Sequence, residues 1–147
     1  DEKELLAISS NAYGFKTQAK QLDTSAKAGK AFLTVAESAQ ALPVLPVENE
    51  QSHLALLSSA GRLLLVELSE LPMLNKGKGN KLMQLEDGES LLCMTTLNLN
   101  EVLQVAAGQQ QLKLKGDDLK KYIGKRAGKG QLLPRGYQKA NKLWVQR

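Results

Sequence analysis

Three segments rich in lysine and glycine are the part of this sequence best suited to chemistry. Glycine-containing loops let backbone N–H groups approach an anion closely, and neighbouring Lys or Arg side chains supply positive charge. In the middle segment, Lys76, Lys78 and Lys81 place three cations within six residues, a spacing that suits successive phosphates of a nucleic-acid backbone. Any one such loop could equally be a solvated turn. The segments occupy residues 27–30, 76–81 and 125–130.

Two other common phosphate-binding motifs do not fit these segments. A Walker A loop needs Gly-x4-Gly-Lys-Ser/Thr, and the stretch from Gly124 to Lys129 has neither that spacing nor the hydroxyl residue. Gly77-x-Gly79 lacks the third glycine of a dinucleotide-binding turn. The sequence therefore predicts no nucleotide site of either kind and no cofactor bound by this segment.

Side chains that could perform catalysis or bind a metal are few and scattered. His53 and Cys93 are the only soft ligands, and two separated residues do not make a zinc site. We expect His53 to open a strand as a half-exposed residue, Cys93 to pack as a small buried hydrophobe, and Trp144 to lie in the core rather than stack on a base. Because no Ser/His/Asp set or carboxylate pair occurs, no catalytic site is predicted.

The lysine-glycine segments occupy equivalent places in an internal repeat. Gly14, Gly61 and Gly108 each follow a short apolar run, and they are 47 residues apart both times. Each glycine is followed by a second apolar stretch, a leucine, a lysine-glycine segment and a further apolar run. This recurring order predicts one domain, residues 1–147, with repeats at about 1–47, 48–95 and 96–147.

Each repeat has the pattern of four strands. Apolar runs of about four to seven residues bounded by Gly, Ser or Asn are typical of strands, and a glycine between two runs is typical of a hairpin turn with positive φ. Four strands in about 47 residues are typical of a propeller blade, and closed propellers have about 4–8 blades. We therefore predict an all-β array of about three four-stranded blades, as a partial or open ring. Its exposed edges favour self-association.

Charge is distributed unevenly along the chain. Residues 1–110 contain 9 Lys or Arg and 13 Asp or Glu, whereas residues 111–147 contain 11 and 2, so the net charges are −4 and +9. A basic segment on a near-neutral body predicts an anionic partner, although a solvated face has the same signature. No apolar run approaches the roughly 18–20 residues of a membrane span.

The start of the chain and the cysteine count add three expectations. The charged start shows no signal peptide, and a single cysteine favours the reducing cytoplasm. The absence of an initiator Met predicts a piece of a longer chain.

Four stretches match a known family. Residues 71–81 read Leu-Pro-Met-Leu-Asn-Lys-Gly-Lys-Gly-Asn-Lys, and shorter matches lie at 12–15, 28–34 and 124–136. Across essentially its whole length, the sequence resembles the C-terminal DNA-binding domain of the A subunit of bacterial type IIA topoisomerases, more closely that of topoisomerase IV than that of gyrase. The resemblance implies a β-pinwheel, a propeller-like ring in which blades exchange strands with their neighbours.

The resemblance also bears on how DNA is held. Gyrase carries a box, Gln-Arg-Arg-Gly-Gly-Lys-Gly, that is needed for wrapping DNA, and residues 124–130 here read Gly-Lys-Arg-Ala-Gly-Lys-Gly. Gly124 thus replaces Gln and Ala127 replaces Gly. A degenerate box argues against gyrase-type chiral wrapping, though not against DNA binding.

What the resemblance implies is sequence-independent binding and bending of duplex DNA, which positions the transported segment for ATP-dependent decatenation and relaxation. The implied partners are the rest of the A subunit together with the B subunit, at the nucleoid in the cytoplasm. In this family the tyrosine that cleaves DNA lies in another domain, and its surrounding motif does not match the sequence around Tyr13, Tyr122 or Tyr137. ATP and Mg serve other parts of the enzyme. A gyrase-type wrapping domain and a propeller-like protein-interaction module stay open as alternatives.

The expected DNA-binding residues are Lys76, Lys78, Lys81, Lys125, Arg126, Lys129 and Arg135, with smaller contributions from Lys27 and Lys30.

Overall fold

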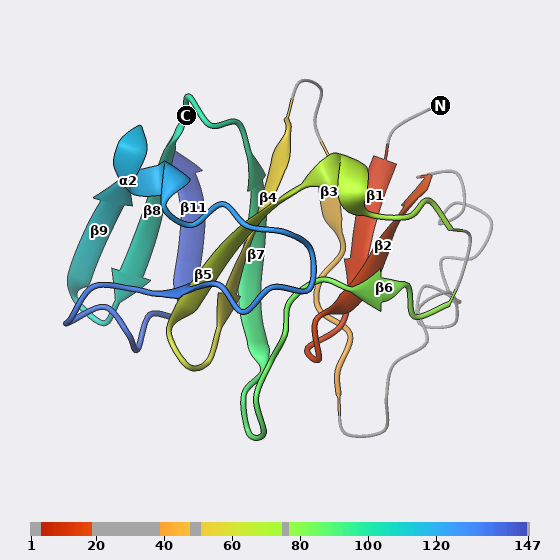
Figure 1. Cartoon of the computed structure of the whole chain (residues 1–147), viewed down its shortest axis with the longest axis horizontal. Helices are drawn as coiled ribbons and strands as arrows, with labels where there is room; N and C mark the ends of the chain where they lie inside the picture. Colours follow the sequence, from red (N-terminus) through yellow and green to blue (C-terminus); the bar gives the residue numbers. More distant parts are fainter. Residues whose placement is uncertain (1–3, 19–38, 48–50, 75–76, 147) are drawn as a thin grey trace.

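Three antiparallel sheets stand side by side in a row (Figure 1). This computed structural model describes residues 4–18, 39–47, 51–74 and 77–146. Lys27, Lys30 and Lys76, three of the predicted DNA-binding residues, lie outside these ranges. The prediction of an all-β fold is confirmed.

Nearly all regular structure belongs to these sheets. The first contains β1 (Glu4–Ile8), β2 (Tyr13–Gln18), β3 (Leu45–Val47) and β6 (Asn80–Lys81), in the order β3-β1-β2-β6. The second contains β4 (His53–Ser58), β5 (Arg62–Glu67), β7 (Leu91–Leu97) and β10 (Gln131–Leu132), in the order β10-β5-β4-β7. The third contains β8 (Val102–Ala107), β9 (Gln110–Leu114) and β11 (Lys142–Gln146), in the order β11-β8-β9. A short 3-10 helix, η2 (Leu68–Glu70), and one helical turn, α2 (Asp117–Lys120), connect them.

The first two sheets are each completed by a strand from a later part of the chain. β6 pairs with β2 through Tyr13↔Lys81 and Gly14↔Asn80, and β10 pairs with β5 at the equivalent place. A single bridge precedes each exchanged strand, Lys16↔Met73 in the first sheet and Leu65↔Ile123 in the second. This is the strand exchange that the resemblance implied. Within the described residues, β9 pairs only with β8.

The apolar cores lie between neighbouring sheets. Leu6 and Ile8 of β1 pack with Leu54, Leu56 and other residues in the core between the first and second sheets. The opposite face of the second sheet packs against the third, so every residue of β4 is buried. Burial on both faces explains why β4 and β5 are almost continuous apolar runs. In the described part of the chain, no helix has the length and apolar character needed to cross a bilayer.

One of the three predicted turn glycines has a different role. Gly61 and Gly108 have positive φ, 79° and 62°, but in the first hairpin the left-handed residue is Ala12, with φ 65°. Gly14 lies inside β2, and the expectation that it forms the turn is wrong. A Cβ there would lie 2.7 Å from both the Ala7 carbonyl oxygen and Ile8 Cγ1, so only glycine fits this contact between β1 and β2.

Candidate nucleic-acid interface

Two segments that carry the exchanged strands cross from one sheet to the next. The first crossing segment comprises residues 71–74 and 77–85, and the second comprises residues 121–135. In Figure 1 the second leaves α2, runs in front of the second sheet towards β6, and returns as β10. Backbone hydrogen bonds fix its outward run, because Leu65 N–H donates to Tyr122 O (2.8 Å) and Gly124 N–H donates to Leu65 O (2.9 Å).

The two lysine-glycine loops in the described part of the chain meet where the crossing segments touch. Ala127 N–H donates to Leu82 O (2.9 Å), and Gln84 N–H donates to Gly128 O (2.8 Å). Arg126 Nη1 donates to Lys81 O at 3.0 Å, which ties the most basic part of one loop to the other. The structure therefore brings together Lys78, Lys81, Lys125, Arg126 and Lys129, which we call the basic face.

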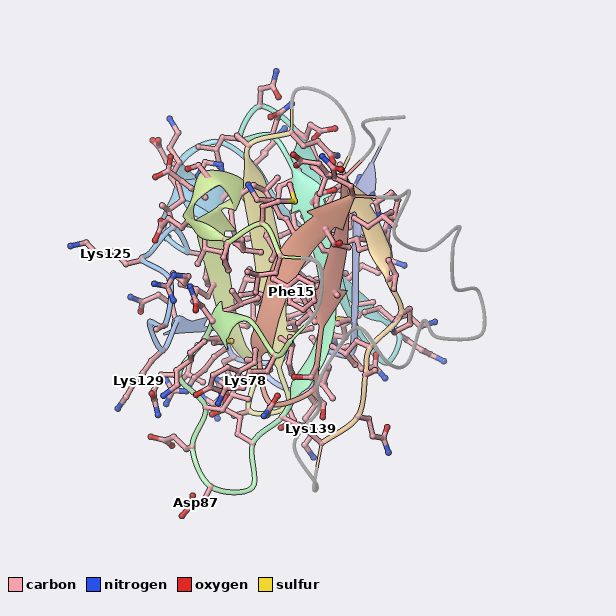
Figure 2. The ribbon with its side chains drawn as sticks, turned by 90° about the vertical axis from the view of Figure 1, so that its right-hand side faces the viewer. Phe15, Lys78, Asp87, Lys125, Lys129 and Lys139 are labelled. Carbon is pink, nitrogen blue, oxygen red and sulfur yellow. The ribbon has the colours of Figure 1, made fainter. Side chains whose placement is uncertain are left out.

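Three lysines of the basic face are exposed: Lys78, Lys125 and Lys129. Figure 2 shows Lys125 and Lys129 pointing outward on the same side of the molecule. Lys78 Nζ lies 5.0 Å from the centroid of the Tyr13 ring, a cation–π distance that orients the side chain and leaves its charge at the surface. These lysines can therefore meet an anion without rearrangement of the core.

Lys81 and Arg126 are half-buried and also hold the crossing segments in place. Lys81 Nζ donates to Gln84 Oε1 at 3.0 Å, and Arg126 N–H donates to Glu70 Oε1 at 3.2 Å. Because a guanidinium has five N–H donors, the bond from Arg126 to Lys81 O leaves further donors for a phosphate. The charges of Lys81 and Arg126 add to the basic face, but the hydrogen bonds that they make within the protein hold the crossing segments together.

Arg135 belongs to neither of these two loops, because it follows β10 in the sequence. It is exposed in the segment after β10, where Leu133 N–H donates to Gly61 O at 2.8 Å.

One glycine in each of the two loops, Gly79 and Gly130, has a packing reason that the sequence did not reveal. Gly79 (φ +76°) and Gly130 (φ +79°) each come directly before an exchanged strand. A Cβ at Gly79 would overlap the Gly14 carbonyl, and one at Gly130 would lie 2.8 Å from Leu63 O. These glycines let β6 and β10 lie against β2 and β5. Close approach to a phosphate is not needed to explain them.

Ala127, at the position where the gyrase box has glycine, has a left-handed backbone conformation. Its φ is 71°, in the left-handed region, where a side chain costs roughly 1–2 kcal/mol. Its N–H bond to Leu82 O holds it there. Ala127 thus forms part of the turn between Lys125 and Lys129.

His53 and Cys93 are structural residues. His53 does open β4, but it is buried with 7 % exposure, so the half-exposed expectation is wrong. Its Nδ1 lies 2.7 Å from Ser52 Oγ, and burial lowers its pKa, which keeps the ring neutral at pH 7. Cys93 is half-buried against the core, and desolvation raises the pKa of its thiol to about 11. Searched over the described residues, no group of three or more His, Cys, Asp or Glu could hold a metal.

Trp144 was expected in the core, but it does not belong to the core between the second and third sheets. Leu143 and Val145 pack against the core between the second and third sheets. Because neighbouring residues of a strand point to opposite faces, Trp144 lies on the other face of the third sheet, where it is half-buried. The alternation of β11 could have shown this, since both neighbours are apolar.

One acidic contact on the basic face was missed. Glu86 Oε2 lies 3.8 Å from Lys129 Nζ, and both side chains are about 60 % exposed. Glu86 begins an acidic turn with Asp87 and Glu89, in which Glu86 N–H donates to Glu89 Oε1 at 2.8 Å. The signal was present in the sequence as three acids within four residues shortly after the middle loop.

Comparison with known proteins gives consistent matches. The family described as "DNA gyrase C-terminal domain, beta-propeller" matches residues 3–38 and 52–92. The A subunit of DNA topoisomerase 4 from Pseudomonas aeruginosa is 39 % identical over 153 residues, covering 99 % of this chain and 20 % of that protein. The protein of the same name from Escherichia coli K12 is 32 % identical over 151 residues, with the same coverage. The chain thus spans about a fifth of the length of these curated relatives.

Solved structures agree on the fold. The E. coli ParC C-terminal domain superposes with a TM-score of 0.86 at 30 % identity, covering 99 % of this chain and 61 % of that one. A crystal structure of the C-terminal domain of DNA topoisomerase IV gives a TM-score of 0.78 at 19 % identity, covering 100 % and 47 %. The strand-exchanged array is therefore the β-pinwheel architecture.

Proposed function

Because this chain belongs to the DNA gyrase C-terminal domain family, we propose that it binds duplex DNA along the basic face without reading base sequence. One observation carries the proposal: lysine-glycine loops from two different repeats meet at the Arg126–Lys81 contact and place Lys78, Lys125 and Lys129 at the surface. Exposed cations on two loops that are joined by backbone hydrogen bonds suit the regularly spaced phosphates of a duplex.

The mechanism we propose is electrostatic. Each lysine that neutralises a phosphate releases condensed counterions, and such contacts fix the register of the protein on DNA while carrying no sequence information. We propose that a duplex following the crossing segments bends, which costs on the order of 1–6 kcal/mol for tens of base pairs. Additional contacts along the path must offset that cost.

In the longer protein, we propose that this domain holds the DNA segment to be transported during decatenation and relaxation. Relatives about five times as long are named as the A subunit of DNA topoisomerase 4, which supports this placement. Cleavage and the use of ATP and Mg would then belong to the rest of the A subunit together with the B subunit, at the nucleoid in the cytoplasm. Because Ala127 and Gly124 depart from the gyrase box, we propose bending rather than chiral wrapping. A DNA ring-closure assay distinguishes the two, since wrapping would change the linking number of the closed circles.

A salt titration tests the proposed function. We expect gel-shift binding to two duplexes of equal length and unrelated sequence with the same affinity. The logarithm of the association constant should fall linearly with the logarithm of salt concentration, by about 0.9 per phosphate neutralised. A chain that serves as a protein-interaction module would show little affinity near physiological salt, and that result would overturn the proposal.

Glu86 should weaken DNA binding, because its carboxylate repels phosphate and pairs with Lys129. We expect Glu86→Gln to raise the affinity about two- to fivefold, in line with exposed ion pairs worth about 0.2–1 kcal/mol. Glu67→Gln, at an exposed position at the end of β5, makes the same change in net charge and serves as the control. Equal gains in DNA affinity for the two variants would show that the effect comes from the net charge of the chain and not from the position of Glu86.

A further inference from the structure

The third sheet lies at one end of the row of described sheets, and one of its faces points away from the second sheet (Figure 1). Leu103 and Val105 of β8, Leu114 of β9 and, partly buried, Leu143 and Val145 of β11 pack against the second sheet. Strand alternation therefore places the intervening residues on the opposite side. We call this side the end face, and its residues are Gln104, Ala106, Gln111, Lys113, Lys142 and Trp144.

Strand register arranges the end face in two rows across three strands. Trp144 pairs with Gln104, which pairs with Lys113, and in the next row Lys142 pairs with Ala106, which pairs with Gln111. Lys113, Lys142 and Gln111 are exposed and Trp144 is half-buried, whereas Gln104 and Ala106 of the central strand are buried. The indole thus lies among polar and cationic side chains.

The equivalent face of the second sheet is chemically different. Its residues there are Ala55, Leu57, Leu63 and Leu65, all with 0 % exposure, and they form the core against the third sheet. Seating a further blade on the end face in the same way would bury Lys113 and Lys142 without charged partners, at a high desolvation cost.

The charge of the end face indicates an anionic partner. The strands β8, β9 and β11 contain no Asp or Glu, whereas β9 and β11 contribute one lysine each to the face. The second crossing segment, which carries most of the basic face, begins directly after α2, which follows β9 and carries the exposed Asp117 and Asp118. A duplex lying on that segment is therefore led towards the third sheet.

We propose that the end face is a second contact surface for the same DNA duplex, reached only by DNA long enough to bend past the crossing segments. This inference rests on the proposed function. Lys113 and Lys142 would neutralise phosphates there, and Trp144 would be covered by the sugar-phosphate backbone. A short duplex would occupy the basic face alone.

Trp144 is the only tryptophan in the chain, so its fluorescence reports on this face directly. The chain is saturated with a duplex of about 12 base pairs, roughly 40 Å at 3.4 Å per base pair, and in parallel with one of about 40 base pairs. We expect both to bind, and only the longer duplex to reduce acrylamide quenching of Trp144. Saturation by the longer duplex with unchanged quenching overturns the end-face inference alone. If neither duplex binds, the proposed function itself fails.

A charge-removal pair provides the second test. Lys113→Gln with Lys142→Gln should lower affinity for the longer duplex about tenfold and reduce its salt slope by about 2, with no effect on the shorter duplex. The matched pair Lys78→Gln with Lys125→Gln should weaken binding of both. Equal affinity of the Lys113/Lys142 variant and the wild type for the longer duplex would overturn the inference. Protection of Trp144 that grows with protein concentration without DNA would identify a second copy as the occupant, and would also overturn it.

Discussion

Replacing Lys78, Lys125 and Lys129 together by glutamate should lower the affinity for plain duplex DNA at least about a hundredfold. The three side chains are exposed on the basic face, and each reversal converts an attraction to phosphate into a repulsion. At about 1 kcal/mol per unit charge pair at 4 Å in water, three reversals amount to several kcal/mol before screening by salt. Gel-shift titration at several salt concentrations measures the loss, and the salt slope should fall by about 2.7.

The control for this variant keeps charge and changes only the side chain. Lys→Arg at the same three positions should retain most of the wild-type affinity, because either cation neutralises a phosphate and releases counterions. Circular dichroism of both variants should match the wild type, since none of the three side chains is buried. Undiminished binding by the glutamate variant would place the DNA elsewhere on the molecule.

Substituting Gly79 by alanine should destabilise the fold by about 3 kcal/mol or more. Left-handed backbone costs alanine roughly 1–2 kcal/mol, and the added Cβ would also overlap the Gly14 carbonyl. Backbone cannot rotate away as a side chain can, so β6 must move off β2 and lose the pairing of Asn80 and Lys81. Urea denaturation followed by circular dichroism measures the change in the free energy of unfolding.

Gly108→Ala separates the cost of a left-handed backbone from the cost of the steric overlap. Gly108 also has positive φ, +62°, but a Cβ there meets nothing within 4 Å. We expect it to cost only about 1–2 kcal/mol, the penalty of the backbone conformation. If the two glycine variants lost equal stability, close packing of β6 on β2 would not be a determinant of the fold.

The local elements of this fold could be predicted from sequence, but the pairing between repeats could not. Short apolar runs and the glycines at 61 and 108 indicate hairpins, because these signals depend on neighbouring residues. Nothing in residues 80–81 or 131–132 shows that they pair with strands far back in the chain. That exchange followed only from the family resemblance. Gly14 was misread for another reason: its role comes from close contact with Ala7 and Ile8 of β1 in its own hairpin, while Ala12 takes the left-handed position of the turn.

The sequence predicted which charged residues form the candidate site, but it did not predict the contacts between them. Lys78, Lys125 and Lys129 are exposed as expected of phosphate ligands. The anchoring of Arg126 to Lys81 O and the pairing of Glu86 with Lys129 join residues from different loops, which spacing in one sequence cannot reveal. The binding role of every one of these residues stays a prediction.

Strand exchange also sets the order in which this chain can become stable during synthesis. The first sheet lacks an edge strand until residues 72–81 have emerged, and the second until residues 122–132 have emerged. Until then β2 and β5 are open edges to which other chains can add. Consequently, a truncation at the end of any repeat does not remove a self-contained blade: it uncovers the edge of the preceding one. The unit of assembly is the interlocked pair of neighbouring sheets.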